Sequence, residues 1–321
     1  MALVHPGRLL PKLLGVLRRR QREFARSLVH GARCRKTRIV LPVGLQLSAV
    51  AFAQTGLTST PPVAPQIVDI RSGNLHLKAY FWKPAGQGPF PAILFNHGSG
   101  DNDPQHTAGR TMADAASYLA PAFLKHRYAL LYLCRRGQGL SADQGPFTQD
   151  LLKHAQAKGA DARNELQDQL LTGSQLDDAL AGLRFLKSAP DIDPKRIAIV
   201  GHSFGGMLTL LSGDRDISIR AEVAFAAGAN SWHASQQLRD RILAAIGKTA
   251  APIMLLYAAN DYDLMPARDI SGELNRLHRS HLLKIYPAIG KTSDDGHNLL
   301  YLGISVWEAD VFQFLDDNLK R

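Results

Sequence analysis

The segment Gly201-His202-Ser203-Phe204-Gly205-Gly206 constrains the fold of this chain more than any other stretch. It directly follows the apolar, β-branched run Ile197–Val200 and precedes a helix-forming stretch, so the pattern predicts a strand, a sharp turn and a helix. A G-x-S-x-G nucleophile elbow requires this context. Side chains at positions 201 and 205 would collide across so tight a bend, which accounts for the two glycines. The segment therefore predicts that Ser203 projects its hydroxyl from the turn as a nucleophile.

Apolar runs alternate with amphipathic stretches over residues 67–321, and this alternation predicts an α/β fold. The expected strands are 67–71 and 75–82 as an opening hairpin, then 92–96, 128–134, 197–200, 222–226, 253–257 and 282–286. The expected helices are 111–126, a long stretch over 149–188, 267–278 and 305–319. Strands separated by helices indicate a mostly parallel central sheet flanked by helices on both faces.

Ligands bind such sheets at the carboxyl ends of the strands, so the partners of Ser203 are expected in loops that follow strands. Asp261 comes soon after the strand 253–257, and His297 ends the loop that follows the strand 282–286. The chain order Ser, Asp, His is the order that the nucleophile-elbow fold uses. His297 would take the proton of the serine hydroxyl and later donate it to the leaving group. Asp261 would hold the imidazole in the required tautomer.

Other acids and bases lie close to these positions in the sequence. Asp263 is the alternative acid, and Asp261 is preferred because it comes sooner after the strand end. His278 and His281 precede a strand, so they are expected at the opposite edge of the sheet as surface residues. The side chain of His202 should leave the turn in a different direction from that of the nucleophile, and a structural role is expected for it.

An acyl-transfer site also needs donors for the oxyanion. The amide of Phe204 follows the nucleophile directly, and a second donor is expected from the loop Asn96–Gly100 after the strand 92–96. Glycines in that loop would let backbone N–H groups approach the substrate oxygen. Ser99 is the expected second donor, through its backbone N–H. Each such donor typically contributes about 2.7–4 kcal/mol in the transition state.

The excess positive charge of the chain lies at its N-terminus. The chain holds 38 Lys and Arg against 28 Asp and Glu, but residues 1–38 account for 11 of these bases and only one acid. The remainder carries 27 of each sign and is electrically balanced. A folded domain without net charge argues against nucleic acid as a partner.

The basic segment leads into an apolar run over residues 39–53 that ends Ala51-Phe52-Ala53. A basic region, an apolar run of about 15 residues and a small-x-small site predict a secretory signal cleaved before Gln54, and hence export. The alternative is an Arg-rich organelle transit peptide, and the run is too short to span a membrane. The Thr- and Pro-rich residues 54–66 are expected to be a linker to the domain at 67–321.

The two cysteines and the glycine pattern give no indication of a cofactor. Cys34 lies in the segment 1–53 that is expected to be removed, and Cys134 ends an apolar run. The chain that remains after cleavage would hold one cysteine and could close no internal disulfide. Cys134 is expected to be a buried strand residue. No Cys/His spacing indicates zinc and no G-x-G-x-x-G follows a strand, so neither a metal nor another cofactor is expected.

Residues 67–319 resemble the α/β-hydrolase superfamily, specifically the dienelactone hydrolase-like branch that borders the prolyl oligopeptidase catalytic domain. The pieces that carry this resemblance are Asn96-His97-Gly98, Cys134–Ser141, the elbow, Asn260-Asp261-Tyr262 and Gly296-His297. The resemblance implies an α/β-hydrolase fold, and an insertion around residues 145–171 is expected to supply a small helical cap. Dienelactone hydrolase proper uses a cysteine nucleophile, whereas this elbow has Ser203, which favours a general serine ester hydrolase.

The expected activity is therefore hydrolysis of a small-molecule carboxylic ester or lactone through an acyl-enzyme. Trp232, which follows the strand 222–226, is expected either to line the substrate pocket or to pack against the cap. One alternative is a peptidase, which would lack the β-propeller of prolyl oligopeptidases because about 13 residues separate the expected cleavage site from the first strand. The other is a hydrolase fold that serves as a ligand receptor without turnover.

Overall fold

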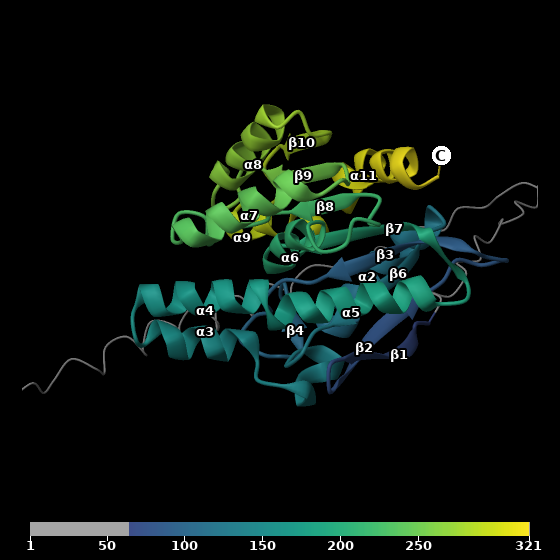
Figure 1. The fold of residues 1–321 in the computed structure, drawn as a ribbon, viewed down its shortest axis with the longest axis horizontal. Helices are drawn as coiled ribbons and strands as arrows, with labels where there is room; N and C mark the ends of the chain where they lie inside the picture. Colours follow the sequence, from purple (N-terminus) through teal and green to yellow (C-terminus); the bar gives the residue numbers. More distant parts are fainter. Residues whose placement is uncertain (1–63, 321) are drawn as a thin grey trace, which may run out of the picture. The chain divides into compact units, whose positions relative to one another are not determined.

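The protein is described from a computed structural model, which places residues 64–320. Its central feature is an eight-stranded sheet in the order β1-β2-β6-β3-β7-β8-β9-β10 (Figure 1). The strands of this sheet are β1 Gln66–Ser72, β2 Leu75–Trp82, β3 Phe90–Asn96, β6 Ala129–Cys134, β7 Ile192–His202, β8 Glu222–Phe225, β9 Ile253–Ala258 and β10 His281–Tyr286. β2 pairs antiparallel with β1 and with β6, and the other pairings are parallel. The predicted opening hairpin and mostly parallel sheet are confirmed.

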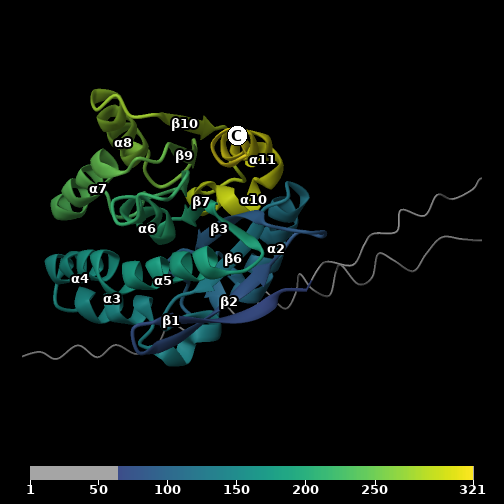
Figure 2. The same ribbon diagram turned by 45° about the vertical axis from the view of Figure 1, so that its right-hand side comes forward.

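Helices cover both faces of the sheet, as predicted. They are α2 Met112–Lys125, the 3-10 helix η1 Gly139–Gln144, α3 Thr148–Gln156, α4 Ala160–Thr172, α5 Ser174–Ser188, α6 Phe204–Ser212, α7 Gln236–Lys248, α8 Met265–Arg276, α9 Ser293–His297, α10 Leu299–Leu302 and α11 Ile304–Leu319. α2 and α11 lie on one face, and α5, α6, α7 and α8 lie on the other (Figures 1 and 2). This sandwich fixes the strand ends that carry the candidate site.

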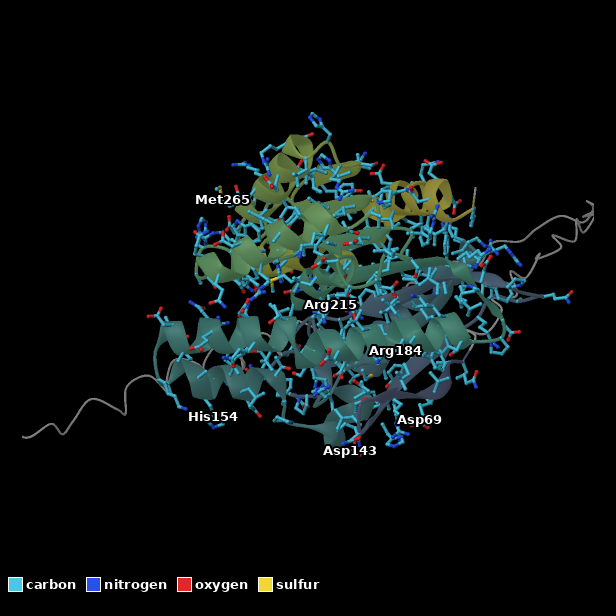
Figure 3. The ribbon with its side chains drawn as sticks, in the orientation of Figure 1. Asp69, Asp143, His154, Arg184, Arg215 and Met265 are labelled. Atoms are coloured by element: carbon cyan, nitrogen blue, oxygen red, sulfur yellow. The ribbon has the colours of Figure 1, made fainter. Side chains whose placement is uncertain are left out.

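Burial on both faces explains why the central strands are apolar runs. Every residue of β3, β6 and β9 is buried. Neighbouring residues of a strand point to opposite faces of the sheet. Phe95 therefore packs on the face that α2 and α11 cover, and Leu94 packs on the face that α5 covers. Charged side chains such as Asp69 and Asp143, which Figure 3 shows at the rim of the domain, are exposed.

The fold differs from the sequence prediction in several places. The expected long helix over 149–188 is three helices, because Gly159 has φ 120° and Gly173 has ψ −110°, and neither conformation continues a helix. The first two, α3 and α4, occupy the region of the expected insertion. The chain also forms helix α7 and a small hairpin of β4 His106–Thr107 and β5 Arg110–Thr111, which were not predicted.

The expected leader, residues 1–53, and most of the expected linker lie outside the described residues. Export and cleavage before Gln54 therefore stay predictions. Among residues 64–320, no helix combines the length and the apolar character that a membrane span requires. The one described cysteine, Cys134, is buried at the end of β6, and its burial raises the pKa of its thiol to about 12. It therefore stays a neutral thiol at physiological pH.

Candidate active site

Ser203 lies on a strained turn between β7 and α6. Its backbone has φ 55° and ψ −117°, in the left-handed region that non-glycine residues rarely adopt. β7 ends at His202 and α6 begins at Phe204, so the turn consists of the serine alone. A Cβ atom at Gly201 would lie 2.2 Å from the carbonyl oxygen of Gly205, so only glycine fits there. Backbone strain held by the surrounding structure is a recurrent feature of functional sites.

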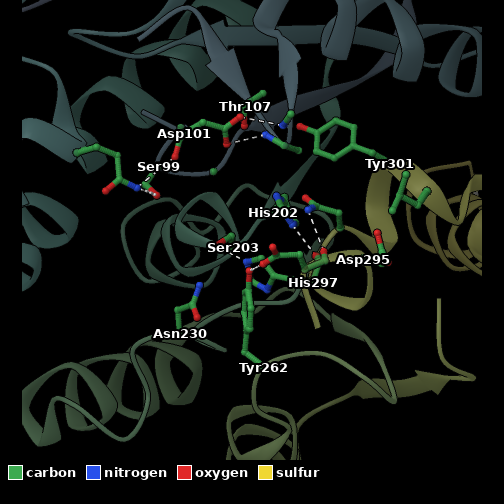
Figure 4. Close-up of a pocket in the computed structure, with 18 residues that line it drawn as sticks. Ser99, Asp101, Thr107, His202, Ser203, Asn230, Tyr262, Asp295, His297 and Tyr301 are labelled. Carbon is green, nitrogen blue, oxygen red and sulfur yellow. Dashed lines mark hydrogen bonds between the residues drawn. The ribbon is translucent and has the colours of Figure 1, made fainter. Parts of the chain in front are cut away.

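Ser203, His297 and Asp261 lie in one hydrogen-bonded chain, and Figure 4 shows its Ser203 and His297 end. The Ser203 hydroxyl donates to Nε2 of His297, with Oγ and Nε2 2.9 Å apart. Nδ1 of His297 donates to Oδ1 of Asp261 over 2.8 Å. The Asp261 side chain is fully buried, and this burial raises the pKa of its carboxyl despite the contact with His297. The structure thus brings together the three residues that the sequence placed at the carboxyl ends of β7, β9 and β10.

Local hydrogen bonds hold the acid and the base in place. Asp261 Oδ1 also accepts the backbone N–H of Tyr262 at 2.7 Å. The neighbouring Asn260 spans to the loop before His297: its Nδ2 donates to the carbonyls of Ile289 and Thr292, and its Oδ1 accepts the Ile289 N–H. The family resemblance includes Asn260 without indicating a role for it, and its three hydrogen bonds show that it joins the two loops that carry the acid and the base.

The rival acid and bases lie elsewhere. Asp263 turns away from His297: its Oδ2 lies 3.0 Å from Nε2 of His233, and its Oδ1 accepts the N–H of Met265. His281 begins β10 at the opposite edge of the sheet and contacts the Ser271 hydroxyl. His278 follows the end of α8, before the same strand.

His202 is buried behind the nucleophile. Its Nε2–H donates to the backbone carbonyl of His297 over 2.8 Å. Burial lowers the pKa of His202 to about 3, with the charge of His297 as a smaller cause, so its imidazole is neutral. The ring therefore connects the elbow to the loop of the candidate base without itself carrying charge.

The two expected oxyanion donors flank Ser203. Phe204 is the first residue of α6, where a backbone N–H has no acceptor within the helix. Gly98 and Ser99 line the same cavity as Ser203. The Ser99 carbonyl accepts from Nε2 of Gln138 and the Ser99 hydroxyl accepts from Nε2 of Gln149, both over 2.7 Å. Gln149 belongs to α3, so the inserted helices reach the edge of the site.

A cavity of about 490 Å³ opens over these residues. It is lined by Gly98, Ser99, Gly100, Asp101, Thr107, Ala108, Gly109, Gln149, His202, Ser203, Asn230, Tyr262, Asp294, Asp295, His297, Asn298, Tyr301 and Leu302. Most of the side chains in this lining are polar. Three of the lining residues carry carboxylates, and none of the lining residues is a lysine or an arginine. Tyr262 stands beside the candidate base, with ring centroids 4.7 Å apart, and its hydroxyl donates to Asp294.

Trp232 does not line this cavity. Its indole is buried, packs over Gly228 and donates to Oδ2 of Asp269 on α8 over 2.7 Å. The expectation of a pocket residue at this position is therefore corrected to packing, and the loop after β8 contributes Asn230 to the cavity instead. Sequence reasoning assigned no individual role to Gln138, which lies in the segment Cys134–Ser141, and it missed Gln149, because polar residues in a loop and at a helix start are indistinguishable from solvated ones without the fold.

Comparisons with known proteins agree with this architecture. Residues 77–292 match the model of the dienelactone hydrolase family. The chain is 28% identical over 154 residues to the putative hydrolase YtaP of Bacillus subtilis, covering 46% of this chain and 48% of that protein. It is 26% identical over 211 residues to the quorum-quenching protein AidA of Acinetobacter baumannii, covering 62% and 59%. The matches thus span about half of each relative's length.

A solved structure adds evidence on the fold alone. The dienelactone hydrolase of Anabaena variabilis superposes with a TM-score of 0.55 at 18% sequence identity. The superposition covers 80% of this chain and the whole of that one. At this level of identity the likeness establishes a shared α/β-hydrolase fold.

Proposed function

Because this chain belongs to the dienelactone hydrolase family, we propose that it is a serine hydrolase that cleaves carboxylic esters or lactones through an acyl-enzyme intermediate. One observation carries the proposal: the hydrogen-bonded chain from Ser203 through His297 to Asp261, whose first two members line a cavity. A serine hydroxyl is a poor nucleophile at neutral pH and needs an adjacent base, which His297 would supply. Asp261 would orient that base and stabilise its charged form.

The geometry supports the following sequence of steps. As Ser203 Oγ attacks the carbonyl carbon, its proton passes to Nε2 of His297. The oxyanion that forms would lie against the backbone N–H groups of Phe204 and Ser99. Collapse of this intermediate releases the alcohol, which takes the proton from His297, and leaves the acyl group on Ser203. Water then attacks the acyl-enzyme with His297 again as base, and the carboxylic acid leaves.

The charge of the cavity supports a substrate that is neutral or cationic. Asp101, Asp294 and Asp295 line it, and no lysine or arginine among its lining residues offsets them. Like charges repel over several ångströms in a partly desolvated cleft, so an anionic acyl or alcohol group would be disfavoured. The polar lining also favours groups that accept and donate hydrogen bonds over long alkyl chains.

A panel of substrates tests the proposal. It contains p-nitrophenyl esters of increasing acyl length, a lactone, and a peptide p-nitroanilide, each measured with the wild-type enzyme and with Ser203→Ala. We expect turnover of short esters or of the lactone and none by the variant. Turnover of the anilide alone would instead support a peptidase. Substrate binding without any turnover would support a ligand receptor built on this fold.

Export is proposed separately, from residues 1–53 alone. Fusing these residues to a reporter tests it, since a secretory signal would direct the reporter out of the cytoplasm and be removed before Gln54. Retention of the uncleaved reporter in the cytoplasm would contradict export, and delivery to an organelle would support the transit-peptide alternative.

A further inference from the structure

A buried arginine lies directly behind the loop that carries Ser99. Arg135 follows the last residue of β6, and its side chain has no solvent exposure. Within the described residues it forms no salt bridge: Nε donates to Oε1 of Gln175 over 2.8 Å, and Nη1 is buried without a partner. The adjacent Arg136, by contrast, is bound through Nε and Nη2 to the carboxylate of Asp178. Burying a cation without a direct ion pair is costly, and the Asp178 carboxylate acts on Arg135 only through its charge, so the position of Arg135 requires an explanation.

The strongest contact of Arg135 within this loop is with the carbonyl oxygen of Gly98. Nη2 of Arg135 donates to this oxygen over 2.9 Å, and Nδ1–H of His97 donates to it over 2.7 Å. Burial and the charge of Arg135 lower the pKa of His97 far below its usual range, so His97 is neutral and its Nε2 accepts the backbone N–H of Arg135. One carbonyl thus receives two hydrogen bonds, and one of the donors is a cation.

That carbonyl and the N–H of Ser99 belong to the same peptide group. The Gly98–Ser99 bond is trans, so the N–H points opposite to the C=O. Because the buried Arg135 side chain binds this oxygen, the Ser99 N–H at the other end of the peptide group points away from Arg135, and Ser99 lines the cavity together with Ser203. Within residues 64–320 this N–H donates to no backbone carbonyl. A charge-assisted bond to the carbonyl also withdraws electron density from the peptide and strengthens its N–H as a donor.

We propose that Arg135 is a positioning residue for catalysis: through the Gly98 carbonyl it orients and polarises the Ser99 N–H that would stabilise the oxyanion. The inference rests on the proposed acyl-transfer function. The Arg135 guanidinium carbon also lies 5.7 Å from the centre of the Phe204 ring, so the same cation packs over the side chain of the residue that carries the other expected donor. Burial lowers the pKa of Arg135 to about 10, so the guanidinium remains charged at neutral pH.

This role predicts effects on the transition state that a merely structural arginine would not have. Arg135→Met removes the cost of burying a charge, but it also removes the donor to Oε1 of Gln175 and one of the two donors to the Gly98 carbonyl, so some loss of stability is expected. Where the variant folds, it should react slowly. Removing one direct oxyanion donor costs about 10²–10³ in kcat, so we expect a loss of about 10- to 100-fold for a residue that acts through that donor. KM should change by less than about threefold, since the substrate ground state carries no oxyanion.

The experiment compares Arg135→Met, Arg135→Gln and Arg135→Lys with the wild type, and uses Arg136→Gln as the matched control. The measurements are the melting temperature, kcat and KM for the best ester, the affinity of a trifluoromethyl ketone that forms an oxyanion on serine, and the rate of labelling by a fluorophosphonate. We expect kcat, ketone affinity and labelling rate to fall together in both neutral variants, and Arg135→Lys to retain part of each. In Arg136→Gln the melting temperature should fall while kcat stays within about twofold.

The proposal is overturned if a folded neutral variant keeps its kcat, ketone affinity and labelling rate within about twofold of the wild type. If Arg135→Met does not fold, Arg135→Gln provides this test. A rise in KM with an unchanged kcat would also overturn the proposal. A wild-type protein that reacts with the fluorophosphonate but hydrolyses no ester would refute the proposed substrate class, while the labelling rates would still test Arg135. A wild-type protein without any labelling would refute both.

Discussion

His202 donates its Nε2–H to the backbone carbonyl of His297, with the two atoms 2.8 Å apart. The residue directly before the candidate nucleophile is thereby bonded to the main chain of the candidate base. Since the pKa of His202 is lowered to about 3 by burial, this bond has a neutral donor across the physiological range. The distance between Ser203 and His297 is thus set through a side chain that takes no part in proton transfer.

Replacing His202 should impair catalysis through position. His202→Phe keeps an aromatic ring at this position but removes the N–H that donates to the buried carbonyl of His297. The loss of this donor should lower the free energy of unfolding by about 1–3 kcal/mol. We expect kcat to fall about 10- to 100-fold with little change in KM, since misplaced catalytic groups lose their alignment. His202→Gln can still donate and should retain more activity. Ester kinetics below the melting temperature of each variant test this, and a folded His202→Phe with wild-type kcat would contradict it.

The two neighbouring carboxylates should differ sharply in their effect on turnover. Asp261→Asn would favour the wrong tautomer of His297, and a change of this kind costs about 10⁴ in kcat in a serine protease triad. Asp263→Asn removes a contact with His233 outside the triad, so its kcat should stay within about threefold of the wild type. Parallel kinetics of the two isosteric variants measure the difference. The acid is misassigned if the substitution at Asp263 proves the more severe.

Charge on the substrate should change its rate. At low salt we expect kcat/KM for p-nitrophenyl hemisuccinate, which is an anion, to be at least about tenfold lower than for a neutral ester of similar length. This difference in kcat/KM should narrow as salt is added. Asp294→Asn should narrow it too, because one lining carboxylate is lost while the Tyr262 hydroxyl keeps an acceptor. Asp143→Asn, which removes an exposed carboxylate outside the cavity, is the control. Equal rates for both esters would contradict the assigned polarity of the cavity.

Glu222 gives the protein a pH-dependent stability that is separate from the site. Its carboxyl is buried at the start of β8 and accepts the Thr249 hydroxyl, and burial raises its pKa to about 8. The folded state therefore holds this proton more tightly than the unfolded state does. The contribution of Glu222 to the free energy of unfolding is fully present below about pH 4.5 and is lost as the pH rises toward about 8.

Glu222→Gln should remove this dependence, because the amide keeps an acceptor for Thr249 and cannot ionise. We expect the melting temperature of the variant to match that of the wild type near about pH 5 and to exceed it near about pH 9. Thermal unfolding of both proteins across this range measures the effect. A variant that is destabilised equally at every pH would show that the carboxylate is accommodated in the folded state as a charge.

The parts of the fold that the sequence predicted well are those whose pattern is set by burial. β3, β6 and β9 are buried on both faces and read as continuous apolar runs. The stretch 149–188 was predicted as one long helical stretch although its helical apolar spacing is clear only over 175–187, and the structure breaks it at Gly159 and Gly173. Amphipathic spacing reports the buried face of a helix, and it does not report where the chain turns.

The candidate site divides along the same line. Ser203, Asp261 and His297 could be placed together because each follows a parallel strand at one edge of the sheet. Gln149 could not be found, because its contact with Ser99 depends on how α3 packs against a loop 50 residues away. The hydrogen bond of Trp232 to Asp269 on α8 could not be predicted either, because a position after a strand does not show which helix a side chain contacts.

The most direct test of the whole account is covalent labelling at Ser203. The wild-type protein and Ser203→Ala are treated with a fluorophosphonate, and the modified peptide is identified by mass spectrometry. We predict one adduct, on Ser203, that forms in parallel with the loss of ester turnover and is absent from the folded variant, whose kcat should be lower by about 10⁴–10⁶. An unlabelled wild-type protein, or a Ser203→Ala variant that keeps the label and the turnover, would contradict the assignment of Ser203 as the nucleophile.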